Sequence, residues 1–476
     1  GPGYKNDATS GGSYGGHGGF SNENYIYGSS LWPLIVGSGG ATTAGGGAIA
    51  IFSDKLLLDG SISSHGQYNG GDWGAGSGGS ILINVSEFIY TGILQAEGGD
   101  VAGVGGYGGG GGRLAVYYEE IQGDFDNMSV SGGIGDTQYG EAGTLILADG
   151  KEVTILGGFR FQGVSGRANE SVNTSFFSTD VPGRWDVSNF SIIGADVVVD
   201  NDDFVLDVEG SLVVNGSVVG DSFVGNLAVN ASDVVFDSSV LDFDVKQFFV
   251  VDCDNFSVFN SSVRSNVNVS AGWVLVDGLS VFNATGKGFP VGEGLGYHGN
   301  TAGGSFGGVG GFSDESYVYG SSLWPVRMGS GGANTAGGGA VFVDTGVFVL
   351  DGGVEASGAY HGGNFGAGSG GSILINVSGF DFGGFLEADG ASVGGLSGWG
   401  GGGGRIAVYF NDSNFVVGDL ENISVEGGTG SAGYGTSGSA LVSDTFSNEA
   451  WITGGFRFQG VSGRANESVN TSFFST

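Results

Sequence analysis

The sequence predicts an all-β chain that folds as a parallel β-helix (β-solenoid) with glycine-rich loop excursions and tandem modules. Its apolar residues, mostly Val, Ile, Leu and Phe, stand in short runs without the period of an amphipathic helix. One long stretch, GGFRFQGVSGRANESVNTSFFST, occurs unchanged at 157–179 and again at 454–476. Shorter periods recur before the first stretch and between the two. Repetition on both scales is typical of solenoids and repeat arrays.

Composition separates this chain from fibrous and disordered glycine-rich proteins. Gly accounts for 105 of 476 residues, but only 5 are Pro and no G-X-Y period exists, which excludes collagen. Aromatic residues make up 12%, too many for a flexible glycine–serine linker. The net charge of −35 argues against nucleic acids and anionic membranes as main partners. Cys253 is the only cysteine, so we expect no intrachain disulfide and a small buried hydrophobe there.

The two glycine-rich segments carry a period of about 32 residues, within the range of repeat proteins. Each apolar run follows a glycine-rich loop, as in GSGGSILI and GGGGRLAVYY. In the first segment the runs begin at Ile49, Ile81, Leu114 and Leu145, with spacings of 32, 33 and 31. In the second segment they begin at Val341, Ile373, Ile406 and Leu441, with spacings of 32, 33 and 35. We expect these runs to be strands that stack on one another.

The segment between them has a shorter period. The motifs VVNGS, VFDSS, VFNSS and VFNAT place Asn215, Asp237, Asn260 and Asn283 at one phase, with spacings of 22, 23 and 23. Such a period suits one coil of a parallel β-helix, which stacks on the next at about 4.8 Å. Inward Val, Ile, Leu and Phe then form apolar ladders, and outward Asp, Asn and Ser form polar ones.

These periods predict four modules. Residues 1–156 form a glycine-rich module, and 157–293 form a connector with a module of the shorter coils. Residues 294–453 repeat the first module, and 454–476 begin a second connector. Because Gly permits close backbone approach, we expect the glycine-rich loops to fold flat on their neighbours. The aromatic residues expected to hold these loops by packing are Trp73, Tyr107, Phe365 and Trp399.

The alternation GSGGSILINV, GILQAEGG and GGGGGRLAVYY resembles the glycine-rich, right-handed parallel β-helix repeats of secreted surface and adhesin-like proteins from archaea and bacteria. The resemblance is strongest over residues 1–156 and 294–453, and the middle segment resembles a generic right-handed β-helix. This resemblance implies surface display and assembly, without a defined active site. The motifs are more specific for the fold than for the function.

Asparagine sequons predict export. Sixteen of 28 Asn residues stand in N-x-S/T, where composition alone would give about four or five. Clustering of Asn and Ser in turns is the alternative explanation, but dense N-glycosylation fits the number better, and a glycan requires an exposed Asn. The predicted sites are Asn84, Asn127, Asn169, Asn173, Asn189, Asn215, Asn230, Asn255, Asn260, Asn268, Asn283, Asn376, Asn411, Asn422, Asn466 and Asn470.

Catalysis is the weakest of the functional interpretations. A β-helix lyase or hydrolase needs carboxylates, often holding Ca²⁺, with a basic residue nearby. The candidates are Asp200, Asp202, Asp203, Asp252 and Asp254, with Lys246 or Arg264. Among 49 acidic residues such clusters arise by chance, and the histidines His65 and His361 do not align between the repeats. We therefore expect no enzyme and no cofactor, and structural Ca²⁺ on an acidic ladder stays open.

Repeat-paired arginines point to structural contacts. Arg113 and Arg405 follow the glycine runs at matching places, and we expect them to bridge to carboxylates or backbone carbonyls. The duplicated stretch carries further pairs and is the predicted junction between repeats or subunits. Its junction residues are Phe159, Arg160, Phe161, Arg167, Phe456, Arg457, Phe458 and Arg464.

The sequence thus predicts a structural subunit or repeat segment of an extracellular, N-glycosylated filament or surface fibre. Its partners are copies of itself, joined head to tail, and covalent N-glycans. An adhesin stalk that binds glycans or cells is the alternative, and a polysaccharide lyase or hydrolase a second one. No apolar run approaches the ~20 residues of a membrane-spanning helix, so no membrane insertion is expected in this segment. Because the chain shows neither an initiator Met nor a signal peptide, we expect the exported form to start downstream of both.

Overall fold

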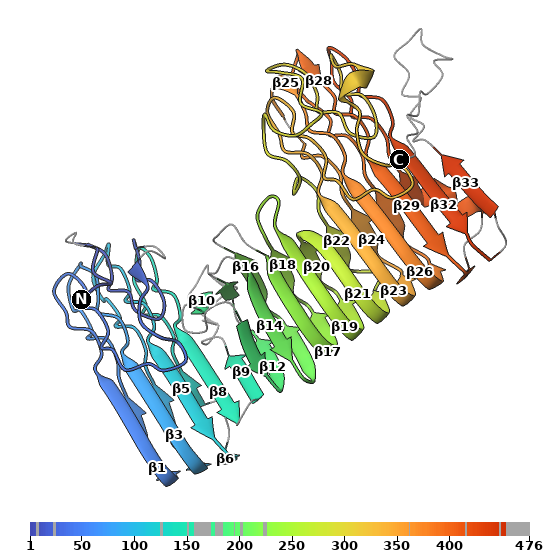
Figure 1. The fold of residues 1–476 in the computed structure, drawn as a ribbon. Coiled ribbons are helices and arrows are strands. Elements are labelled where there is room, and N and C mark those ends of the chain that lie inside the picture. The colour runs from blue at the N-terminus through green and yellow to red at the C-terminus, as the bar shows by residue number, and fades with distance from the viewer. Residues whose placement is uncertain are drawn as a thin grey trace. The chain divides into compact units, whose positions relative to one another are not determined.

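The structure is a computed structural model that divides into two compact units. Unit 1 comprises Gly1–Phe223 and unit 2 comprises Val224–Thr476. The structure describes residues 1–5, 9–21, 25–123, 127–149, 152–156, 173–176, 184–194, 196–199, 203–221, 226–360, 362–414, 417–446 and 449–453. Both units are built from strands (Figure 1), and no α-helix occurs in the described ranges. Nor does any helix there have the length and apolarity needed to cross a membrane.

Unit 1 contains sixteen strands in its described part. They are β1 (Ala48–Leu58), β2 (Ser61–Ser63), β3 (Ser80–Tyr90), β4 (Ile93–Gln95), β5 (Arg113–Tyr118), β6 (Glu120–Gly123), β7 (Met128–Ser129), β8 (Thr144–Asp149), β9 (Glu152–Leu156), β10 (Asn173–Phe176), β11 (Arg184–Val187), β12 (Asn189–Ile193), β13 (Asp196–Val199), β14 (Phe204–Val208), β15 (Ser211–Asn215) and β16 (Val218–Asp221).

Unit 2 repeats this pattern with seventeen described strands and two short 3₁₀ helices. The strands are β17 (Leu227–Asp237), β18 (Val240–Asp242), β19 (Phe248–Phe259), β20 (Ser262–Arg264), β21 (Asn266–Val276), β22 (Val281–Asn283), β23 (Ala340–Leu350), β24 (Gly353–Glu355), β25 (Phe365–Gly366), β26 (Ser372–Phe382), β27 (Phe385–Glu387), β28 (Gly398–Trp399), β29 (Arg405–Phe410), β30 (Asp412–Ser413), β31 (Ile423–Ser424), β32 (Ser439–Asp444) and β33 (Glu449–Thr453). The helices are η4 (Glu315–Tyr317) and η5 (Val417–Asn422).

Long strands pair in parallel, and many of them are followed by a turn and a short strand, as β17 is by β18 and β23 by β24. The short strands form a second parallel sheet, as in β18, β20 and β22. We call a long strand with its following short strand a rung. Antiparallel pairs occur in the described part only where a glycine-rich segment ends, at β8–β9 and β32–β33. Long parallel sheets of this kind are compatible with a β-solenoid.

The predicted strand alignment of the first glycine-rich segment is confirmed. Ile49 pairs with Ile81, Ile81 with Leu114 and Leu114 with Leu145. In Figure 1 the glycine-rich loops of each unit gather at the ends where the long strands begin. We call the two glycine-rich segments copy 1 (residues 1–149) and copy 2 (residues 293–446). Most matching residues of copy 1 and copy 2 are separated by the same number of residues as Arg113 and Arg405.

In copy 2 the predicted alignment holds for three strands and is wrong by one residue in the fourth. Val341 pairs with Ile373 and Ile373 with Ile406, but Ile406 pairs with Ala440 rather than Leu441. A slip of one residue moves a side chain to the other face of a strand. Ala440 and Leu441 are both buried, so the apolar pattern does not distinguish the two faces here.

The shorter period also needs a correction. Tight turns place residues with positive φ at evenly spaced positions, namely Gly194, Gly216, Ser238 and Asn260. Asn260 therefore lies in the turn itself, one residue beyond the position of Asp237, which pairs with Phe259. Asn and Gly tolerate this left-handed conformation better than other residues do.

The last motif of that series lies in the other sheet. Asn283 belongs to β22 and pairs with Glu355 of the next short strand. The preceding long strand β21 follows β19 at a shorter spacing than the earlier strands, as Val251 pairs with Val269. A turn closed by Asp277 and Ser280 takes the place of the left-handed residue. The rungs of this segment therefore differ in length.

The core consists of columns of apolar side chains, one from each rung. Along one column Val229, Val251, Val269, Val343 and Ile375 pair in turn. Each of them is at most 2% exposed. The expected apolar ladder is therefore confirmed for these residues. Burial of one such side chain contributes roughly 1.5–3 kcal/mol, so stacking, more than local propensity, stabilises the rungs.

Cys253 extends a neighbouring column of the same sheet, between Ala231 and Ala271. It is free and buried, as expected for a small apolar residue. Burial, together with the charges of Asp252, Asp254 and Asp233, raises the pKa of its thiol to about 12. A thiol with so high a pKa is not a reactive nucleophile at neutral pH.

Candidate functional site

Each glycine-rich copy contains one fully buried arginine that holds a loop. In copy 1, Arg113 begins β5 and is 0% exposed. Its Nε and Nη2 donate to the carbonyl oxygen of Tyr27, at 3.3 and 3.2 Å. Its Nη1 donates to the hydroxyls of Ser30 and Thr144. We call this arrangement the arginine clamp, because the cation fastens the YGSSLWP loop to the strands.

The clamp recurs in copy 2. Arg405, also 0% exposed, donates from Nε to the carbonyl of Tyr319 at 3.1 Å. Its Nη1 donates to the hydroxyls of Ser322 and Ser439. Burial lowers the pKa of Arg405 to about 10, which still leaves it charged at neutral pH. The expectation that these arginines reach backbone carbonyls is confirmed, and their partner is the other motif that the sequence repeats.

The glycine-rich loops are buried and pair with one another through their backbones. In copy 1, the N–H groups of Gly78, Gly110 and Gly12 donate in turn to the carbonyls of Gly110, Gly12 and Ala75, at 2.8–2.9 Å. The same bonds recur in copy 2, from Gly370 to Gly402, Gly402 to Gly304 and Gly304 to Ala367. Buried backbone groups need such partners. We call this network the glycine lattice, and it confirms that the loops fold onto their neighbours.

Two of the four aromatic residues expected to hold the loops do so. Tyr107 packs on Phe20 with ring centroids 5.3 Å apart, and Trp399 packs on Phe312 at 5.1 Å. Trp73 and Phe365 occupy matching positions, but they are 44% and 46% exposed. These two aromatic residues therefore present much of their surface to solvent.

The described sequon asparagines lie at the surface. Nine are exposed: Asn84, Asn127, Asn215, Asn230, Asn255, Asn260, Asn268, Asn411 and Asn422. Asn189, Asn283 and Asn376 are half-buried. By contrast, Asn69 and Asn266 stand outside sequons and are buried. Asn169, Asn466 and Asn470 lie outside the described residues, as does the side chain of Asn173.

The three half-buried sequon asparagines bind carboxylates on neighbouring strands. Asn189 donates to Glu152 at 2.9 Å, Asn283 to Glu355 at 2.7 Å and Asn376 to Asp344 at 3.0 Å. Such bonds join polar side chains of neighbouring strands, one pair at each place. A glycan would be attached to the same amide nitrogen. Asn255 makes a similar bond to Asp233 at 2.8 Å but is exposed, so the three half-buried sites are the least favourable of the described ones for modification.

Among the candidate catalytic residues that the structure describes, the basic ones do not pair with the acidic ones. Asp252 and Asp254 flank Cys253 on β19 and face solvent. The two basic candidates pair with other carboxylates, Lys246 with Glu293 and Arg264 with Asp242. Asp203 is exposed, while Asp200, Asp202 and His361 lie outside the described residues. His65 is exposed and accepts a bond from the backbone of Glu97 at its Nδ1.

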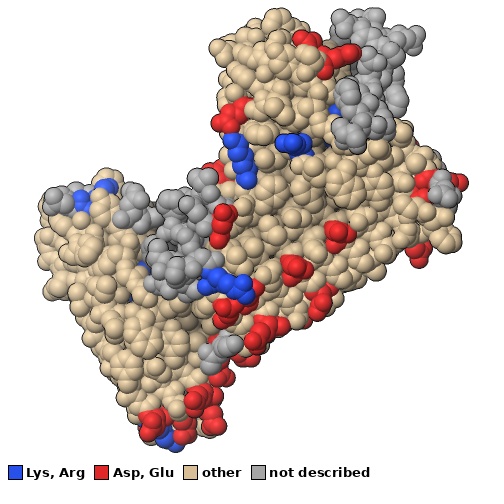
Figure 2. All heavy atoms as spheres, viewed as in Figure 1, with Lys and Arg blue, Asp and Glu red and all other residues tan. Residues whose placement is uncertain are grey.

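On the face that Figure 2 shows, acidic side chains lie at several separate places rather than in one patch. Among the described residues, no group of three or more His, Cys, Asp or Glu side chains is placed to share a metal ion.

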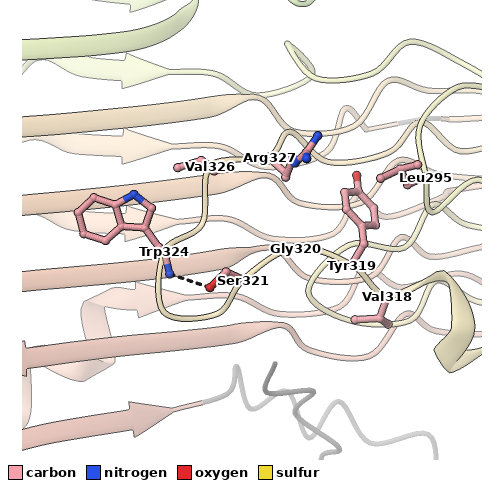
Figure 3. Close-up of a pocket in the computed structure, with 8 residues that line it drawn as sticks. All are labelled: Leu295, Val318, Tyr319, Gly320, Ser321, Trp324, Val326 and Arg327. Carbon is pink, nitrogen blue, oxygen red and sulfur yellow. Dashed lines mark hydrogen bonds between the residues drawn. The ribbon is translucent and has the colours of Figure 1, made fainter. Parts of the chain in front are cut away.

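Unit 2 contains a surface hollow beside the arginine clamp (Figure 3). Its volume is about 570 Å³. Its lining residues are Leu295, Val318, Tyr319, Gly320, Ser321, Trp324, Val326 and Arg327. Trp324 lies at one end, 49% exposed, and Tyr319 and Leu295 lie at the other, with Arg327 between. An aromatic face beside a guanidinium group is suited to binding a polar ring such as a sugar.

The predicted junction residues cannot be placed in this fold. Phe159, Arg160, Phe161, Arg167, Phe456, Arg457, Phe458 and Arg464 all lie outside the described residues.

No protein-family model matches the chain, and neither a curated protein nor a solved structure matches it.

Proposed function

We propose that this chain is a structural subunit or repeat segment of an extracellular, N-glycosylated filament or surface fibre, folded as a right-handed β-solenoid. The observation that supports it best is the continuous in-register stacking of rungs, with apolar columns inside and sequon asparagines outside. Each rung rests on its neighbours, so the architecture extends by adding rungs. The clamps and the glycine lattice stabilise the loops that accompany the rungs.

Glycopeptide mass spectrometry of native material tests the glycosylation part of the proposal. We expect occupancy at the nine exposed sequons and low occupancy at Asn189, Asn283 and Asn376. Unmodified Asn260 and Asn268, both exposed on adjacent rungs, would contradict it. Electron microscopy of the same material tests the fibre: we expect elongated particles joined end to end, whereas isolated compact monomers would contradict the structural role.

An adhesin stalk is the second candidate function, and the hollow beside Trp324 favours it. Copy 1 provides a natural control, because Ile35 stands where copy 2 has Arg327. If the hollow binds glycans, Trp324→Ala and Arg327→Ile should each abolish binding on a glycan array. Trp73→Ala, at an exposed aromatic outside the hollow, should leave binding unchanged. Loss of binding with Trp73→Ala alone would place the site elsewhere.

A further inference from the structure

The first rung of copy 1 and the first rung of copy 2 are equivalent, but within the residues that the structure describes only the second is covered on both sides. β1 and β23 are both 11 residues long and pair in the same register with the next strand. On its other side, β23 pairs with β21 from Val267–Val341 to Val276–Leu350, and β24 pairs with β22. In Figure 1, β1 lies at the edge of its sheet with β3 on one side.

The exposed fractions of the core side chains differ between the two rungs in the same way. In β23, Val341, Val343 and Phe348 are at most 2% exposed. Their counterparts Ile49, Ile51 and Leu56 in β1 are half-buried. The short strands that follow differ in the same way. In β24, Val354 is 0% exposed. Its counterpart Ile62 in β2 is half-buried. The apolar core of copy 1 therefore opens to solvent at this edge.

Two glycines of copy 2 show what the covering rung contacts. A Cβ on Gly339 would lie 2.0 Å from Oδ1 of Asn266, and one on Gly352 would lie 2.2 Å from the carbonyl of Ser280. Both contacts come from the rung β21–β22. The counterparts in copy 1 are Gly47 and Gly60, and a Cβ on either would meet nothing within 4 Å.

Asn266 adds specific hydrogen bonds to the apolar contact between the covering rung and the first rung of copy 2. It is 0% exposed, and its Oδ1 accepts from the backbone N–H of Ala340 at 2.7 Å. Its Nδ2 donates to the carbonyls of Gln247 and Lys287 at 2.8 and 3.0 Å. The position of Ala340 corresponds to Ala48 in copy 1, which is exposed.

We infer that the outer edge of β1 and β2 is an assembly interface for a rung of the β21–β22 type, supplied by another copy of this repeat. The inference deepens the proposed structural role and rests on it, because it specifies how one repeat joins the next. The register follows from copy 2: the partner's equivalents of Val267, Val269 and Val274 lie opposite Ile49, Ile51 and Leu56. The partner's equivalent of Phe282 then lies opposite Ile62. Strand addition supplies main-chain hydrogen bonds, and the side-chain columns supply specificity.

A synthetic peptide of residues 266–287, labelled for fluorescence anisotropy, tests the interface on the intact chain. We expect saturable binding of one peptide per chain, with slower hydrogen exchange confined to residues 48–63. Gly47→Leu should weaken binding at least tenfold, because the side chain fills the space that the Asn266 amide needs. This variant should still fold, since the space is open.

Gly362→Leu is the matched control, because a Cβ there also meets nothing within 4 Å, and it lies in copy 2. A peptide with Val269→Asp and Val274→Asp controls for the apolar columns and should not bind. No binding, equal binding by the Gly47→Leu chain, or protection away from β1 would overturn the inference. If native material forms fibres although the peptide fails, only this inference is wrong. If the peptide binds while native material stays monomeric, the fibre role is wrong.

Discussion

Copy 1 and copy 2 share their loops and differ in their neighbours. Both bury one arginine under a YGSSLWP loop and both form the glycine lattice with the same backbone bonds. Yet Ile51 of β1 is half-buried, and its counterpart Val343 of β23 is 2% exposed. The loops are therefore specified within each copy, while burial of the rungs depends on what is stacked beside them.

A second difference concerns carboxylates along the short strands. In copy 2, Asp389 accepts from the hydroxyl of Ser424 and the N–H of Glu426, both at 2.6 Å. Burial, and after it the charge of Glu387, raises the pKa of Asp389 to about 7. In copy 1 the same position holds Glu97, close to His65. One fold thus carries an acidic stack in one copy and an acid beside a histidine in the other.

The largest expected effect is loss of a clamp. Arg405→Ala removes the hydrogen bonds to Tyr319, Ser322 and Ser439 and leaves a cavity beside the carbonyl of Tyr319, so we expect a loss of about 3–5 kcal/mol in unfolding free energy. Arg113→Ala should lower the unfolding free energy by the same amount if the two copies are equivalent. Urea denaturation measures both. Arg264→Ala, at an exposed side chain, is the control and should change stability by about 0.5 kcal/mol or less. Equal effects at Arg264 and Arg405 would refute the clamp.

The second effect separates the covered rung from the open one. Ile51 and Ile83 are the same residue in paired positions of β1 and β3. Ile83 is 0% exposed, so Ile83→Ala should cost about 2–5 kcal/mol. Ile51→Ala should cost less than half as much, because solvent already reaches its side chain. Urea denaturation of the two variants is the measurement, and equal losses would show that the β1 edge is as well packed as the interior.

A smaller effect is expected in the glycine lattice. A Cβ on Gly403 would lie 2.0 Å from the carbonyl of Val425, and one on Gly111 would lie 1.9 Å from that of Val130. Gly403→Ala and Gly111→Ala should each cost about 1–3 kcal/mol, because backbone must move. Thermal unfolding compares them with Gly362→Ala, which has open space. A stable Gly403→Ala chain would mean that the loops are loosely packed.

A further expected effect is a pH dependence carried by Asp389 of copy 2. The pKa of Asp389 in the folded chain, about 7, lies above the unfolded value of about 3.9. Between these values the folded chain holds a proton that the unfolded chain has lost. The contribution is therefore complete below about pH 4 and is lost as the pH rises through 7.

Asp389→Asn should flatten the dependence of unfolding free energy on pH between about 4 and 7. Glu97→Gln provides the corresponding change in copy 1. If Asp389→Asn leaves the curve unchanged, the burial of this carboxyl has no energetic consequence.

Much of the strand pattern was predictable because each rung repeats its apolar positions. The register of Ile49, Ile81, Leu114 and Leu145 follows from their spacing alone. The slip at Leu441 was not predictable, since Ala440 and Leu441 are both apolar and both buried. The prediction that Asn283 shares one phase with Asn215 is wrong because the rung before Asn283 is shortened, with Val251 paired to Val269. No motif in the sequence reveals this shortening.

The clamps illustrate what sequence reasoning identifies only in part. Two repeated features, the YGSSLWP loop and the arginine, were each visible, but they lie 83–86 residues apart. Their contact depends on the path of the glycine-rich chain between them. The open edge of β1 has no sequence signal, because its residues are as apolar as those of the covered β23. Only the comparison of exposed fractions in the two copies reveals it.

The glycine lattice also limits how such a gene can change. Every substitution that replaces a lattice glycine adds at least a methyl group, and at Gly110 or Gly402 that group would lie within about 2.1 Å of a carbonyl oxygen. Point mutation is therefore a poor source of variation in these loops. Duplication of a whole segment keeps all the backbone contacts inside it. We expect relatives of this chain to differ in the number of segments and in their outward-facing residues, while the glycine positions stay fixed.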